Sequence, residues 1–216
     1  TAHRKAGLYL LAYEENGDNK LSVDLSAKDT LKISGFAKGI QTFGNALINL
    51  RGKTIIISAE SDSQGRGLSL NSYDAAKPSI LKAEAENLSI KGSEYAIYAN
   101  DRVDAQLNAT GDINISGLNY AIYANKNTDI QLKTGQNLNI LSDTWGIVSF
   151  DSTVNAQADD AINIKGTVWT SGGNITVGKD SSILQTVING NLTAKNNGYI
   201  AAFVNNAGSS FTGNTT

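Results

Sequence analysis

Residues 95–100 read Tyr95-Ala96-Ile97-Tyr98-Ala99-Asn100, and the same six residue types return as Tyr120-Ala121-Ile122-Tyr123-Ala124-Asn125. A looser copy follows as Trp145-Gly146-Ile147-Val148-Ser149-Phe150, so the step is 25 residues both times. A fixed period of this size indicates a solenoid, in which each unit buries its apolar face only against its neighbours. The chain is therefore predicted to be a repetitive structure.

Two further segments in each period alternate apolar with polar residues. They span 103–108 and 112–116, then 129–133 and 137–140, then 154–158 and 161–165. Alternation at period two, bounded by Gly, Asn, Asp and Ser, is typical of β-strands, and no segment sustains helical spacing. The sequence thus predicts an all-β, parallel β-helix with three strands per coil and about 25 residues per coil, wound right-handed as parallel crossovers are.

The amino-terminal part contains less regular copies of the same repeat. Gly7-Leu8-Tyr9-Leu10, Gly39-Ile40-Gln41-Thr42 and Gly67-Leu68-Ser69-Leu70 align with residues 96–99 at longer spacings. These spacings predict insertions near 12–20, 59–65 and 72–79, which are polar and rich in turn formers. We expect them to project as loops that carry recognition, with candidate contacts at Glu14, Glu15, Asp18, Tyr73 and Asp74.

A column of isoleucines gives an independent check on the register. It is expected to be interior and comprises Ile33, Ile57, Ile90, Ile115, Ile140 and Ile164. Beyond Gly166 the copies fade, but strands are predicted at 174–177, 183–187, 191–194 and 199–204. Because a solenoid grows by adding coils, residues 1–216 are interpreted as one domain, and the interrupted final coil favours a fragment of a longer protein.

Composition argues against several classes of function. Lys plus Arg number 18 against 20 Asp plus Glu, and no basic cluster occurs, so neither nucleic-acid binding nor adsorption to a membrane surface is expected. No run of 18 apolar residues is present, so no membrane insertion by this segment is expected. The absence of cysteine rules out disulfides and thiolate metal sites. We expect no cofactor and no bound metal.

Strand alternation predicts which side chains face outward. Tyr98 and Tyr123 are expected side by side on the exterior, where they either hold a sugar ring or a partner's apolar side chain, or stack to stabilise the sheet. Tyr95, Tyr120 and Trp145 share the parity of Ile97 and are expected to line or close a corner of the core.

Amide side chains also recur at the coil period. The predicted outward rows are Gln106, Gln131 and Gln157 on the second strand and Asn114, Asn139 and Asn163 on the third, while Asn71, Asn100 and Asn125 end the first strand. Stacked amides can bond to one another along the axis, which stabilises the stack. Alternatively, the outward rows offer repeated hydrogen bonds to a second molecule, including another copy of the chain.

A polysaccharide-active enzyme is a further alternative, because some parallel β-helices hydrolyse polysaccharides. Asn127-Thr128-Asp129 and Asp159-Asp160 resemble fragments of polygalacturonases, which need paired carboxylates flanking the scissile bond. The Gly-His-Gly and Arg-Ile-Lys signatures of that family are missing, and the only histidine is His3. We therefore expect no catalytic residues, and we interpret Asp129 as a strand-edge residue matching Asp104.

The pattern of repeats along the chain is similar to that of another group of proteins. Degenerate coils with phrases such as Ala161-Ile162-Asn163-Ile164-Lys165-Gly166 and Gly173-Asn174-Ile175-Thr176-Val177-Gly178 resemble the passenger regions of Gram-negative autotransporters of the type V secretion class. The resemblance implies export through a C-terminal β-barrel outside this chain and attachment to the outer membrane at the cell surface. It also implies adhesion to a surface protein or glycan, or to a sister copy. A structural spacer is the alternative function.

Overall fold

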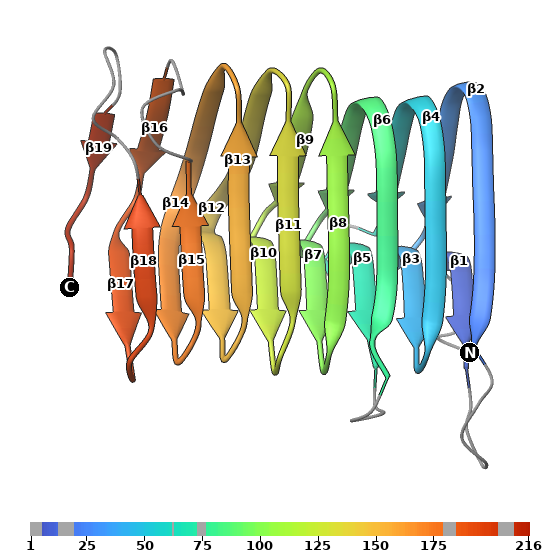
Figure 1. Ribbon diagram of the computed structural model, residues 1–216, viewed down its shortest axis with the longest axis horizontal. Coiled ribbons are helices and arrows are strands. Elements are labelled where there is room, and N and C mark those ends of the chain that lie inside the picture. The colour runs from blue at the N-terminus through green and yellow to red at the C-terminus, as the bar shows by residue number, and fades with distance from the viewer. Residues whose placement is uncertain (1–5, 13–19, 62, 73–76, 179–184, 203–209) are drawn as a thin grey trace.

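The computed structural model describes residues 6–12, 20–61, 63–72, 77–178, 185–202 and 210–216. Within these ranges the chain forms nineteen β-strands, and no helix there is long and apolar enough to cross a bilayer. Figure 1 shows the strands lying across a long shaft, with the first strand, β1, and the last, β19, at opposite ends of the shaft. About seven turns of roughly 25 residues stack as a β-solenoid, which confirms the predicted fold class.

Every strand pairing is parallel, and the pairings divide into three faces that run along the shaft. The tyrosine face consists of β1 (Ala6–Leu11), β3 (Lys38–Phe43), β5 (Arg66–Asn71), β7 (Tyr95–Asn100), β10 (Tyr120–Asn125), the second halves of β12 (Asn137–Phe150) and β14 (Ala161–Ser171), and β17 (Leu192–Lys195).

The other two faces complete each coil. The glutamine face consists of the first halves of β2 (Leu21–Gly35), β4 (Ala46–Ala59) and β6 (Ser79–Gly92), then β8 (Val103–Ala109), β11 (Asp129–Thr134), β13 (Thr153–Ala158), β15 (Asn174–Val177) and β18 (Tyr199–Ala202). The asparagine face consists of the second halves of β2, β4 and β6, then β9 (Ile113–Gly117), the first halves of β12 and β14, β16 (Gln185–Asn189) and β19 (Ser210–Thr212). In Figure 1, β8, β11 and β13 run upward on the near side while the chain advances to the left, which is the predicted right-handed winding.

The predicted isoleucine column is confirmed along its whole length. Each member is the register partner of the next, from Ile33 to Ile164, and the column continues into Ile188. All its members are buried, and they belong to one continuous apolar core. The tetrapeptides beginning at Gly7, Gly39 and Gly67 also stand in the predicted register on the tyrosine face.

Strand boundaries differ from the prediction at two corners. β12 and β14 each join an asparagine segment to a tyrosine segment in one strand. In β2, β4 and β6 the glutamine and asparagine segments form one continuous strand, because hydrogen bonding between coils continues around that corner. β16, β17 and β18 occupy the predicted places to within two residues, although 183, 184, 203 and 204 lie outside the described residues.

The corner between the tyrosine and glutamine faces is a tight turn with left-handed backbone conformations. Asp101, Arg102, Lys126 and Asn127 adopt left-handed backbone conformations there, with φ between 55° and 58°. These turns leave two residues between β7 and β8 and three between β10 and β11. The predicted insertions near 12–20 and 72–79 fall at this corner in earlier coils, and the one near 59–65 falls between the asparagine and tyrosine faces. Their projection as loops stays a prediction, because 13–19, 62 and 73–76 lie outside the described residues.

Candidate interaction face

Aromatic side chains form a continuous stripe on the outside of the tyrosine face. Tyr98 and Tyr123 are register partners, and their rings stack with centroids 5.3 Å apart and planes within 2°. This confirms the predicted outward pair. Such stacking between neighbouring strands stabilises a sheet by itself.

Tyr95, Tyr120 and Trp145 are predicted to line or close a corner of the core. They stand at a corner, but they are not among the buried core residues, so the prediction that they line the core is wrong. Tyr95 and Tyr120 stack at 4.6 Å, and Tyr95 also meets the exterior Tyr98 ring edge-on at 5.3 Å. The parity changes because two consecutive residues, Ala96 and Ile97, are both buried. The strand begins at a corner, where strict alternation does not hold, so Tyr95 lies on the same side as Tyr98.

The stripe continues toward the carboxyl end. Trp145 stacks on Tyr120 at 6.3 Å, Phe150 lies 5.8 Å from Tyr123, and Trp169 lies 4.5 Å from Phe150. Val148 follows Tyr123 in the register but is only 4% exposed. We call the seven rings the aromatic stripe: Tyr95, Tyr98, Tyr120, Tyr123, Trp145, Phe150 and Trp169.

Ring stacking determines what the stripe can offer to a ligand. The Tyr98 and Tyr123 rings cover one another, Phe150 closes the far side of Tyr123, and the guanidinium of Arg66 lies 4.0 Å from the Tyr98 ring centroid. A sugar therefore finds no open ring face on this pair. Ring edges and phenol hydroxyls are what remain for contact.

The phenol hydroxyls of Tyr95, Tyr98, Tyr120 and Tyr123 are free to bond with another molecule. Within the described part of the chain none of them has a hydrogen-bond partner, and none is among the buried polar atoms that lack one. A phenol that is neither bonded nor buried faces water. The stripe thus presents four donor and acceptor groups in two adjacent coils.

Burial of the stripe predicts a response to alkali. Burial, with a smaller effect of Glu94, raises the pKa of Tyr95 to about 12, whereas a tyrosine in the unfolded chain loses its proton near pH 10. Between these pH values only the unfolded state ionises, so the stability contributed by neutral Tyr95 is complete below about pH 10 and is lost as the pH rises to about 12. The urea midpoint of the natural protein should therefore decrease between these pH values. We expect this decrease to be smaller in the Tyr95→Phe variant. An unchanged pH profile in that variant, with exposed Tyr199→Phe as control, would contradict this account.

The asparagine ladder is bonded within the chain. Asn139 Nδ2 donates to Asn114 Oδ1 at 2.9 Å, and Asn163 Nδ2 donates to Asn139 Oδ1 at 2.9 Å. The predicted outward row therefore exists, and its amides satisfy one another along the axis. The turn ladder behaves in the same way, since Asn125 Nδ2 donates to Asn100 Oδ1 at 2.7 Å, and Asn71 is the register partner of Asn100.

We expect Asn139→Asp to reveal the ladder as a pH-dependent defect. A carboxylate cannot donate to Asn114, so the variant should lose about 1 kcal/mol of unfolding free energy at neutral pH. A protonated carboxyl group restores the donor, so the loss should shrink near pH 3, below the usual carboxyl pKa. Urea midpoints at both pH values measure the effect, and Asn119→Asp, at an exposed position without a side-chain bond in the described structure, is the control. Equal losses in the two variants would show that the ladder contributes nothing.

The glutamine row is only partly as predicted. Gln106 and Gln131 are register partners, but the next member is Asn155, whose Nδ2 donates to Gln131 Oε1 at 3.0 Å. Gln157 pairs instead with Lys133 and stands two residues further along the strand, in the next outward row. The error arises because this coil is 24 residues long, whereas the step from Gln131 to Gln157 is longer than a coil.

Two sets of predicted contacts can be placed against the structure. The loop residues Glu14, Glu15, Asp18, Tyr73 and Asp74 lie outside the described residues. Asp129 matches Asp104 in the register, as predicted. Burial, together with the nearby Asp104, raises the pKa of Asp129, which the hydrogen bond from Gln131 partly offsets.

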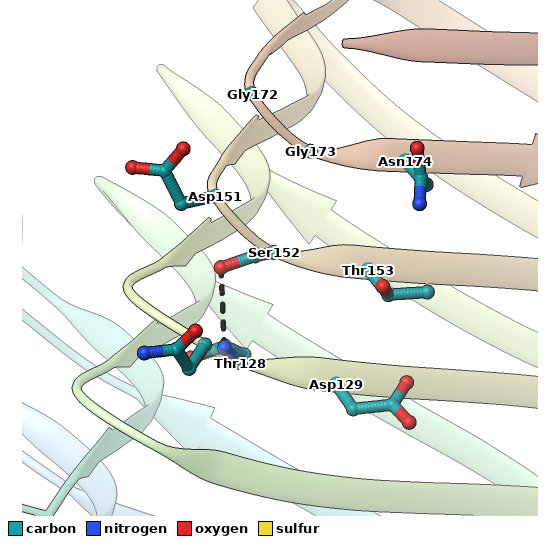
Figure 2. Close-up of a pocket in the computed structure, with 9 residues that line it drawn as sticks. Thr128, Asp129, Asp151, Ser152, Thr153, Gly172, Gly173 and Asn174 are labelled. Carbon is teal, nitrogen blue, oxygen red and sulfur yellow. Dashed lines mark hydrogen bonds between the residues drawn. The ribbon is translucent and has the colours of Figure 1, made fainter. Parts of the chain in front are cut away.

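A shallow polar hollow marks the tight corner near the carboxyl end. Its lining comprises Asn127, Thr128, Asp129, Asp151, Ser152, Thr153, Gly172, Gly173 and Asn174. Figure 2 shows the Asp129 and Asp151 carboxylates at opposite ends of the hollow, pointing away from each other. Hydrolysis of a glycosidic bond needs two carboxylates on either side of one bond, and Asp159 and Asp160 do not line this hollow. No cluster of three metal-ligating side chains occurs in the described ranges.

The chain matches no protein-family profile, no curated protein sequence and no solved structure.

Proposed function

We propose that the protein is the β-solenoid part of a cell-surface adhesin and that it attaches to its ligand through the tyrosine face. The observation that carries the proposal is the row of four unbonded phenol hydroxyls on a rigid, stacked support. Tyrosine is favoured at binding surfaces because it adds contact area and a hydrogen-bonding tip with little loss of side-chain entropy.

Repetition along the shaft supports the same proposal. Two adjacent coils present equivalent tyrosines at the spacing of neighbouring strands, about 4.8 Å, and weak contacts add up when many copies are displayed on one surface. Display at the cell surface rests on the resemblance to autotransporter passengers. The ligand is a surface protein or a glycan.

A structural spacer is the second candidate function, and the amide ladders favour it. The Asn114, Asn139 and Asn163 amides bond to one another, so they have less to offer a second shaft than free amides would. Self-association through this row is accordingly the weaker form of the adhesin hypothesis.

Removal of hydroxyls alone tests the adhesin against the spacer. We expect Tyr98→Phe/Tyr123→Phe to keep the ring stack and the urea midpoint, while cells that display the full-length protein lose most of their attachment to immobilised host glycans and matrix proteins. Exposed Tyr199→Phe is the matched control. Attachment that is unchanged in the double variant, or absent in cells with the natural protein, would favour the spacer.

A further inference from the structure

Two cations lie side by side at the amino-terminal end of the aromatic stripe. Lys38 on β3 and Arg66 on β5 are register partners on the tyrosine face. Neither side chain forms an ion pair or a hydrogen bond in the described part of the molecule. Burial and the positive charge of Arg66 lower the pKa of Lys38, and a nearby carboxylate would act in the opposite direction.

Aromatic rings fix the guanidinium of Arg66. Its central carbon lies 4.0 Å from the Tyr98 ring centroid and 5.0 Å from that of Tyr95. Stacking on a ring uses the face of the guanidinium and leaves its in-plane N–H donors available for a carboxylate or sulfate. Glu94 is near enough to Tyr95 to affect its pKa, yet it makes no ion pair with Arg66 in the described structure.

The cations and the phenols form one line along the shaft. Lys38, Arg66, Tyr95, Tyr120 and Trp145 are successive partners in the register. The Tyr98 and Tyr123 hydroxyl groups belong to the adjacent row. A ligand that lies along this line would meet two positive charges and then a series of neutral hydrogen-bonding groups.

We propose that Lys38 and Arg66 form the charged subsite of a site for an acidic glycan. Its carboxylate or sulfate group binds the two cations, and its hydroxyls bond to the phenols of the aromatic stripe. The inference rests on the proposed adhesin function and names the class of ligand. Because both side chains are cations, the complementary ligand carries negative charge. The phenol row provides partners for the many hydroxyl groups of a sugar chain.

An acidic peptide fits this surface less well. β5 is paired with β3 on one side and with β7 on the other, so its backbone has no free edge to which an extended peptide could add as a strand. A peptide would have to bind through side chains alone. A glycan needs no backbone pairing.

The experiment measures binding of the whole chain to defined oligosaccharides by calorimetry. The probes are hyaluronan oligosaccharides, which carry carboxylates, their neutral methyl esters, and chondroitin sulfate oligosaccharides, which also carry sulfate. The site variant is Lys38→Gln/Arg66→Gln. The matched control is Lys82→Gln/Lys133→Gln, which removes the same charge from the glutamine face, where both lysines are exposed.

We expect the site variant to bind the acidic oligosaccharides about tenfold more weakly or worse, and the control variant to change affinity less than about twofold. The methyl esters should bind much more weakly than the acids. Preference between hyaluronan and chondroitin sulfate identifies the anionic group. Raised salt should weaken binding of the acids and leave the esters unaffected.

Several results would contradict the proposal that Lys38 and Arg66 form a charged subsite. Among them are equal losses in the two variants, equal affinity for acid and ester, no binding of either acidic oligosaccharide, and tighter binding of poly-glutamate. The proposed adhesin function is tested separately from the acidic subsite. If Tyr98→Phe/Tyr123→Phe abolishes attachment while Lys38→Gln/Arg66→Gln leaves it intact, the adhesin survives and the acidic subsite does not.

Discussion

Ile115→Asp is expected to unfold the middle of the shaft. Ile115 has no exposed surface and lies between Ile90 and Ile140 in the interior column. A carboxylate there has no partner and loses its hydration, so the unfolding free energy should fall by roughly 4 kcal/mol or more. Each coil is stabilised by its neighbours, so the defect should spread to the coils on either side.

Urea unfolding, followed by tryptophan fluorescence, measures this effect. Trp145 and Trp169 lie in the coils that follow Ile115, so their fluorescence reports whether the defect spreads toward the carboxyl end. Ser116→Asp is the matched control, because Ser116 is the next residue on the same strand, is not buried, and pairs with Lys91. Similar midpoints for the two variants would mean that the isoleucine column is not the core of the shaft.

Periodicity explains why the column could be predicted and one member of the glutamine row could not. A buried position tolerates few residue types, so isoleucine recurs in successive coils from Ile33 to Ile188 and reports the register directly. An outward position tolerates many, and Asn155 replaces glutamine in the coil where the spacing shortens to 24 residues. The next glutamine in the sequence, Gln157, is therefore in another row.

The aromatic stripe shows a second limit of the pattern. Alternation placed Tyr98 correctly because it is in the middle of β7, but it placed Tyr95 on the wrong side because buried Ala96 and Ile97 are consecutive at a corner. Small residues recur after each corner aromatic, at Ala96, Ala121 and Gly146, and this recurrence could have signalled the change of side.

The cation pair left no signal in the sequence. From the sequence alone, an arginine at the start of a strand is predicted to be an ordinary solvent-exposed charge. Only the stacked coils show that Lys38 is its neighbour, that two tyrosine rings hold it, and that neither cation has a carboxylate partner in the described structure. Partners that lie 28 residues apart become adjacent through the coil, so the site exists only in the folded shaft.

Gly117→Ala is expected to destabilise the shaft strongly, although it adds a single methyl group. A Cβ atom on Gly117 would overlap the Tyr120 carbonyl oxygen and lie 2.8 Å from the Ala96 nitrogen. Both are backbone atoms of the corner that begins the tyrosine face, so neither can rotate away as a side chain could. We expect a loss of about 3 kcal/mol in unfolding free energy, with disturbed stacking of Tyr95 on Tyr120.

Gly52→Ala provides the matched comparison at an open corner. The nearest atom to a Cβ there is 3.4 Å away, which is an ordinary contact. Since alanine restricts the unfolded chain more than glycine does, this variant should be neutral or more stable by up to about 1 kcal/mol. Urea midpoints and near-ultraviolet circular dichroism, which reports the tyrosine stack, measure both variants. If the two substitutions had equal effects, backbone crowding at the corner of the tyrosine face could not be what positions Tyr95 and Tyr120, and the stack would have to be maintained by ring contacts alone.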